Sequence, residues 1–112
     1  MTSKVLLVDD DRHTVKLFEN LFRQRRETLE VAVDAAAARR LFRGTDYNLI
    51  LMDQRLPDGN GLDLIQELRR ERPYQIAIMI TGYADVRDAV RAVREGLYDY
   101  LTKPFDDIES LE

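Results

Sequence analysis

The chain has 112 residues, 45% of them apolar, which predicts a single domain with its own hydrophobic core. It has no cysteine and one histidine, so disulfides are excluded and any metal should be a hard cation bound by oxygen atoms. The net charge of −4 gives no general attraction to nucleic acid, and no apolar run approaches the ~20 residues of a membrane span. The N-terminal residues lack a signal-peptide pattern, so we expect a cytoplasmic protein.

The first predicted strand, residues 4–8, is a short apolar run that ends in three aspartates, Asp9, Asp10 and Asp11. Apolar residues then recur at helical spacing, which predicts a helix over residues 12–26. Asp11 stands where the N-cap of this helix belongs.

A second strand and helix follow. Residues 29–33 alternate between apolar and polar in the way of a less buried strand. Asp34 is then placed to cap an alanine-rich helix over residues 35–42. Gly44 follows that helix, and glycine commonly ends helices.

The centre of the sequence is a run of four apolar residues, 49–52, that leads into Asp53 and then into the turn formers of residues 56–61. A short apolar run bounded by turn signals predicts a strand buried on both faces. Such strands belong to parallel sheets that helices cover on both sides. A helix is predicted over residues 62–72, with Pro73 just beyond its end.

The last part of the chain predicts two more strands. Residues 75–80 form a strand that ends in Thr81, and residues 85–96 contain a helix that begins at an aspartate and ends at a glycine. Residues 98–102 form the fifth strand, which ends in Lys103.

Five strands that alternate with helices predict an α/β fold, a doubly wound parallel sheet with helices on both faces. A capping box at Asp106 and Glu109 opens a last helix that is hardly two turns long before residue 112. This truncated helix leads us to expect that residues 1–112 are one domain of a longer chain.

Polar residues able to do chemistry follow four of the five predicted strands. They are Asp9 and Asp10, Asp53, Thr81 and Lys103. Each alone has an ordinary interpretation as a cap, a turn residue or a surface charge, but the ends of parallel strands share one edge of the sheet. Three carboxylates there would repel each other by roughly 1 to 4 kcal/mol per pair, so we expect Lys103 or a divalent cation to compensate, and magnesium suits this set of oxygen ligands. A carboxylate can also act as a nucleophile and form an aspartyl phosphate.

Four segments of the chain resemble the receiver domain of two-component response regulators. They are VLLVDD at 5–10, LMDQRLPDGNG at 51–61, TGYA at 81–84 and YLTKPF at 100–105. The resemblance extends over essentially the whole chain, and residues 85–105 are most similar to receivers of sigma-54-dependent transcription activators. It implies the flavodoxin-like strand order 2-1-3-4-5 for the five-stranded sheet.

The resemblance also assigns an acidic site. Asp53 would be the phosphoacceptor and one of the magnesium ligands. Asp10 would bind magnesium directly, and Asp9 would bind it largely through water. The backbone carbonyl of Arg55 would be the third protein ligand.

The resemblance further assigns a switch. Lys103 would pair with the phosphoryl oxygens, and its peptide bond to Pro104 would be cis. Thr81 would hydrogen-bond the phosphoryl group, and Tyr100 would move inward as Thr81 moves toward the phosphate. The surface formed by residues 85–112 would change as a result.

The implied function is a phosphorylation-controlled switch in signal transduction and transcription regulation, and not an enzyme. The phosphoryl donor would be a sensor histidine kinase or a phosphotransfer protein. The output would be a domain of the same chain, and residues 85–112 could also pair two copies in a homodimer. We expect no direct binding of nucleic acid or membranes by this domain.

Two other functions are open to a chain of this pattern. A pseudo-receiver is an interaction module that works without phosphate, and it would normally lack Asp53, Lys103 or the acid pair, all of which are present here. An aspartate-nucleophile phosphatase of the haloacid dehalogenase kind would carry Asp-x-Asp after its first strand. This chain has adjacent acids there and its candidate nucleophile on a later strand.

Overall fold

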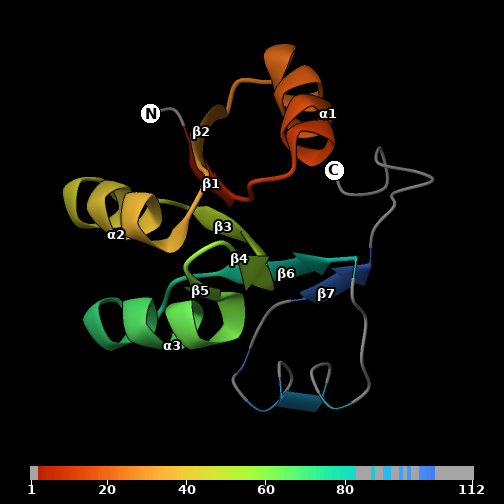
Figure 1. Ribbon diagram of the computed structural model, residues 1–112. Helices are drawn as coiled ribbons and strands as arrows, with labels where there is room; N and C mark the ends of the chain where they lie inside the picture. The colour runs from red at the N-terminus through yellow and green to blue at the C-terminus, as the bar shows by residue number, and fades with distance from the viewer. Residues whose placement is uncertain are drawn as a thin grey trace.

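A computed structural model describes residues 3–82, Arg87, Val90, Arg91, Arg94, Gly96 and the backbone of residues 99–102. A five-stranded sheet runs through the middle of this structure, with the order β2-β1-β3-β6-β7 and parallel pairing throughout (Figure 1). The strands are β1 (Lys4–Val8), β2 (Thr28–Ala32), β3 (Leu49–Asp53), β6 (Ala77–Thr81) and β7 (Asp99–Thr102). When these five strands are numbered 1 to 5 in chain order, their order across the sheet is 2-1-3-4-5, so the predicted fold is confirmed.

Helices cover both faces of the sheet. Helix α1 (Arg12–Arg23) lies on one side, and α2 (Ala35–Gly44) and α3 (Gly61–Glu71) lie on the other (Figure 1). Side chains alternate between the faces along each strand, so Val5 and Leu7 of β1 pack with Phe18 of α1. Leu6 of β1 belongs to the opposite core, beneath α2 and α3.

The predicted helix caps at Asp11 and Asp34 are confirmed. The Asp11 carboxylate accepts a hydrogen bond from the backbone N–H of His13 at 3.2 Å, and Asp34 accepts one from Ala37 at 2.8 Å. Helix α1 ends at Arg23, three residues before the predicted end at residue 26. Gln24 is its C-cap, and the Gln24 N–H donates to the carbonyl of Phe22, a bond too short in sequence to continue the helix.

One element was not predicted. The turn formers after Asp53 fold into a small antiparallel hairpin of β4 (Arg55–Leu56) and β5 (Gly59–Asn60), in which Arg55 is paired with Asn60. Strands of two residues are too short to show the alternation that identifies a strand in a sequence.

Several expectations fall on residues outside the described part of the chain. Residues 87, 90, 91 and 94 are helical, as predicted, but the rest of the predicted helix over 85–96 is not described. The same holds for the Lys103–Pro104 peptide bond and for the last helix over 106–112.

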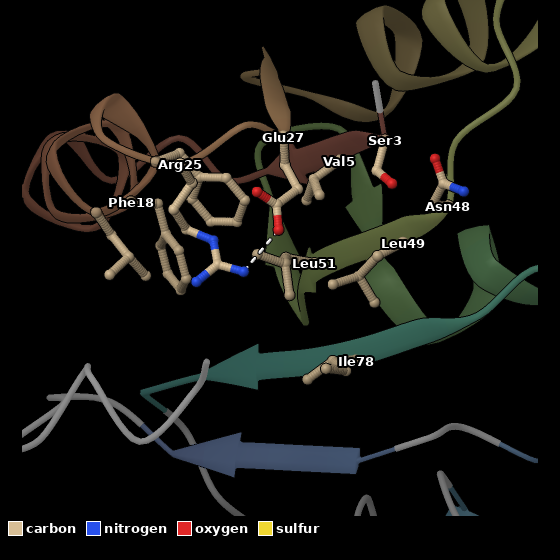
Figure 2. A pocket seen from close by; sticks show the side chains of 11 residues that line it. Ser3, Val5, Phe18, Arg25, Glu27, Asn48, Leu49, Leu51 and Ile78 are labelled. Atoms are coloured by element: carbon tan, nitrogen blue, oxygen red, sulfur yellow. Dashed lines mark hydrogen bonds and ion pairs between the residues drawn. The ribbon is translucent and has the colours of Figure 1, made fainter. Parts of the chain in front are cut away.

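An apolar groove of about 260 Å³ lies between α1 and the sheet (Figure 2). Phe18 and Leu21 of α1 form one side and Val5 and Leu51 of the strands the other. An ion pair between Arg25 and Glu27, at 2.6 Å, also lines it. Residues that precede β1, β2 and β3 take part in the lining, so the groove lies toward the amino ends of the strands, away from Asp53.

No helix within residues 3–82, nor in the described fragments after them, combines the length and the apolar character that crossing a membrane requires.

Phe42 of α2 provides a test of the core. Its side chain is fully buried, and the guanidinium of Arg72 lies 4.0 Å above its ring. We expect Phe42→Ala to lower the free energy of unfolding by about 3–5 kcal/mol, measured by urea denaturation. Phe22→Ala is the control, because Phe22 is only half-buried and has Arg25 at the longer distance of 5.9 Å. Equal losses in the two variants would contradict this account of the core.

Candidate functional site

Three of the predicted site residues meet at one edge of the sheet. Asp9 and Asp10 follow β1, Asp53 ends β3, and these neighbouring strands are in register through Val8 and Met52. One carboxylate oxygen from each aspartate lies within 4.8 Å of the others. Asp9 is fully buried and Asp53 is 6% exposed, whereas Asp10 faces solvent. The cluster is therefore set into the protein but open on one side.

The third aspartate after β1 has a structural role. The Asp11 carboxylate accepts hydrogen bonds from the His13 N–H and, at 2.8 Å, from the Thr14 hydroxyl. The backbone N–H of Asp11 donates to Oδ1 of Asp9 at 2.8 Å. Asp11 thus begins α1 and helps to orient Asp9, while Asp9 and Asp10 belong to the cluster.

Thr81 ends β6, the strand beside β3. Asp53 is in register with Ile80, so Thr81 lies one residue beyond the level of Asp53, and its side chain is fully buried. β7 ends at Thr102, the register partner of Thr81. The described residues do not include Lys103 or the side chain of Tyr100, so the parts assigned to these two stay predictions.

The donor atoms of the cluster suit a hard divalent cation. All three side chains offer carboxylate oxygen, the ligand type that magnesium and calcium prefer, and no softer ligand joins them among the residues that the structure describes. Like charges this close repel each other by roughly 1 to 4 kcal/mol per pair, and a divalent ion would offset that repulsion. The residues present therefore fit the magnesium ion that the sequence predicts.

The segment after Asp53 is held close to the cluster. The Arg55 N–H points to Oδ1 of Asp53 at 3.5 Å, and the Gly61 N–H donates to the carbonyl of Gln54 at 2.7 Å. A Cβ atom on Gly61 would lie 2.1 Å from the backbone oxygen of Asp53, so only glycine fits there. Asn60 caps α3 by accepting the N–H groups of Leu62 at 2.8 Å and Asp63 at 3.2 Å.

Asp58, in the turn between β4 and β5, connects this segment to α2. Its carboxylate accepts the N–H of Ala35 at 2.7 Å and that of Ala36 at 3.1 Å. These hydrogen bonds hold the pKa of Asp58 below its usual value, with the Ala35 N–H as the largest cause. The structural roles of Asp58 and Gly61 were not predicted. No local sequence pattern indicates the contact of Asp58 with a helix end 23 positions away, or the approach of Gly61 to the Asp53 backbone.

Comparison with known proteins identifies the family of this chain. The family profile of the response regulator receiver domain matches residues 5–112. The chain belongs to the response regulator receiver domain family. Receiver domains are regulatory phosphoacceptor switches of two-component systems rather than catalysts, and this coarse function applies to the present chain.

Two relatives show the level of similarity. Response regulator protein PilR of Pseudomonas aeruginosa is 37% identical over 103 residues, which cover 92% of this chain and 23% of PilR. The photosynthetic apparatus regulatory protein RegA of Cereibacter sphaeroides is 38% identical over 102 residues, which cover 91% of this chain and 55% of RegA. The receiver domain thus spans about a quarter of one relative and about half of the other.

Solved structures agree with the fold. A receiver domain protein from Methanospirillum hungatei has a TM-score of 0.90 at 28% identity, covering 99% of this chain and 89% of that one. A response regulator from Burkholderia pseudomallei, whose structure contains a phosphorylated aspartic acid, a calcium ion and citrate, has a TM-score of 0.87 at 28% identity. That similarity covers 97% of this chain and 64% of the Burkholderia chain.

The close approach of Gly61 to Asp53 provides a second test. We expect Gly61→Ala to lower the midpoint of urea denaturation, because the added methyl group would overlap the Asp53 carbonyl. Gly44→Ala is the matched control: no atom lies within 4 Å of the added Cβ, so this change should be neutral or stabilising by up to about 1 kcal/mol. Equal denaturation midpoints for the two variants would show that the overlap with the Asp53 carbonyl does not destabilise the fold, contrary to this prediction.

The lowered pKa of Asp58 predicts a dependence of stability on pH. The folded pKa lies below the unfolded value of about 3.8, so the charged carboxylate stabilises the fold above that value. This contribution is lost as the pH falls through the folded pKa. Asp58→Asn cannot titrate, so its free energy of unfolding should fall less than that of the parent between neutral and acid pH. Parallel profiles in urea denaturation would contradict the assignment.

Proposed function

We propose that this receiver domain accepts a phosphoryl group on Asp53, from a sensor histidine kinase or a phosphotransfer protein, in a magnesium-dependent reaction. The observation that carries the proposal is the cluster of Asp9, Asp10 and Asp53, with carboxylate oxygens within 4.8 Å of one another at the edge of the sheet. Membership of the receiver family supports it.

The chemical step is a transfer to a carboxylate. One oxygen of Asp53 attacks the phosphorus atom of a phosphohistidine, and a P–O bond forms as the P–N bond breaks. The leaving nitrogen keeps the electron pair of that bond and takes up a proton. Because phosphoryl transfer depends mainly on positioning and charge stabilisation, the protein needs little further covalent chemistry.

The residues around Asp53 provide that positioning. Asp10 and Asp53 would hold magnesium directly with carboxylate oxygens, and Asp9 would hold it largely through water. The backbone carbonyl of Arg55 would be the third protein ligand. When bound, the ion supplies positive charge that offsets the repulsion between the carboxylates and the incoming phosphoryl oxygens. The Thr81 hydroxyl would donate a hydrogen bond to the phosphoryl group.

The added phosphoryl group would drive the switch through Thr81, Lys103 and Tyr100. It brings roughly two negative charges and strong hydrogen-bond acceptors. A change from 1:99 to 99:1 between two conformations needs about 5.5 kcal/mol. Two or three charge-assisted hydrogen bonds of roughly 1.5–3 kcal/mol each supply roughly 3–9 kcal/mol, a range that includes that value. The surface of residues 85–112 would then change and control the output.

The length of the relatives bears on the output domain. We infer that residues 1–112 form one domain of a longer cytoplasmic regulator, with its output domain in the same chain, because PilR and RegA extend well beyond the matched region. A homodimer through residues 85–112 and an origin among sigma-54-dependent activators are parts of the same proposal.

Intact-mass spectrometry tests the phosphoacceptor. After incubation with magnesium and acetyl phosphate, the parent chain should gain one phosphoryl group, because Asp53 offers a nucleophile beside a metal site. Asp53→Asn should gain none, and omitting magnesium should abolish the gain in the parent. Asp46→Asn is the matched control, since the Asp46 carboxylate is exposed and precedes β3, whereas Asp53 stands at the other end of that strand. Modification of Asp53→Asn would contradict the assignment of the acceptor.

A further inference from the structure

We propose that Asp58 is a positioning residue: it fastens the β4–β5 hairpin to the N-terminus of α2 and so fixes the Arg55 carbonyl beside Asp53. This inference rests on the proposed function, because it concerns how the magnesium site is held in shape. Asp58 belongs neither to the acidic cluster nor to the predicted ligands.

The contact joins segments that are far apart in the sequence. Oδ1 of Asp58 accepts the Ala35 N–H at 2.7 Å across 23 positions, and Oδ2 accepts the Ala36 N–H at 3.1 Å across 22. Both oxygens of the carboxylate are therefore used. The first N–H groups of a helix have no partner within the helix and carry partial positive charge, so a carboxylate is the preferred partner.

Helix α2 has its own N-cap beside this contact. Asp34 accepts the Ala37 N–H at 2.8 Å, which leaves the N–H groups of Ala35 and Ala36 for Asp58. The two aspartates thus divide the exposed N–H groups of one helix end between them. Of these two aspartates, Asp58 is the one that connects that end to another part of the fold.

The hairpin depends on outside contacts for its position. Each of its strands has two residues, and an isolated two-stranded ribbon is marginal even when longer. Leu56 fastens one side by packing in the core beneath α2 and α3. The turn that follows Leu56 is fastened by Asp58, and a Cβ on Gly59 would lie 3.9 Å from that of Ala35, so the turn rests directly on α2.

Arg55 begins this hairpin, and its N–H points to Oδ1 of Asp53 at 3.5 Å. A shift of the hairpin would move the Arg55 carbonyl relative to the three carboxylates. Magnesium demands near-ideal octahedral geometry, so a small displacement of one oxygen weakens binding. The hydrogen bonds of Asp58 therefore affect magnesium binding indirectly, because they fix the position of the hairpin that carries the Arg55 carbonyl.

A magnesium titration of the 112-residue chain tests this inference, with binding followed by the backbone amide NMR shifts of residues around Asp53. In Asp58→Ala the dissociation constant for magnesium should rise about ten-fold or more, as the loss of an outer support of a metal ligand typically causes. Asp58→Asn keeps one acceptor oxygen, so its dissociation constant should lie between those of the parent and Asp58→Ala.

Asp34→Ala is the matched control. It removes a cap from the same end of α2 without touching the hairpin, so both alanine variants should lower the midpoint of urea denaturation. Only Asp58→Ala should weaken magnesium binding. Unchanged binding in Asp58→Ala, or equal weakening in both variants, would overturn the inference and leave Asp58 as a helix cap only. If the parent itself bound no magnesium, the proposed function would fail as well.

Discussion

Repulsion among three carboxylates is the constraint on which the functional end of this domain depends. Asp9, Asp10 and Asp53 come within 4.8 Å of one another because two neighbouring parallel strands, β1 and β3, end at the same edge. Their mutual repulsion, roughly 1 to 4 kcal/mol per pair, opposes folding. The arrangement makes physical sense as a site for a cation and a phosphoryl group, whose arrival changes the balance of charge. A purely structural module would have no use for it.

The alternatives weighed from the sequence differ in what they require at this edge. A pseudo-receiver needs the fold without the acids, yet the structure brings all three acids together. A phosphatase of the haloacid dehalogenase kind places its nucleophile after the first strand in the chain, whereas Asp53 ends β3. Around Asp53, a glycine in tight contact, a helix cap at Asn60 and the tether at Asp58 hold the loop in place. Such a loop suits a switch in which one residue is modified.

The main elements were predictable because their signals are local. Apolar runs identified β1, β3 and β6, alternation identified β2, and side chains at helical spacing identified α1 and α3. Asp11 and Asp34 were predicted as caps because an N-cap bonds N–H groups only two or three residues ahead. The prediction of α1 was three residues too long, since nothing in its periodicity marks the turn after Arg23. The β4–β5 hairpin was missed because its strands are shorter than any readable pattern.

The sequence by itself determined which chemical groups follow each strand, and so the class of fold and the acids available to a site. Hydrophobic periodicity and residue type are properties of short segments, so they can be read without the structure. Only the tertiary structure decided how near the carboxylates lie and which sides of the cluster are buried. It alone showed Asp58 on the N-terminus of α2 and Gly61 against the Asp53 carbonyl. The Asp58 contact depends on how separate elements pack together, and no local pattern records it.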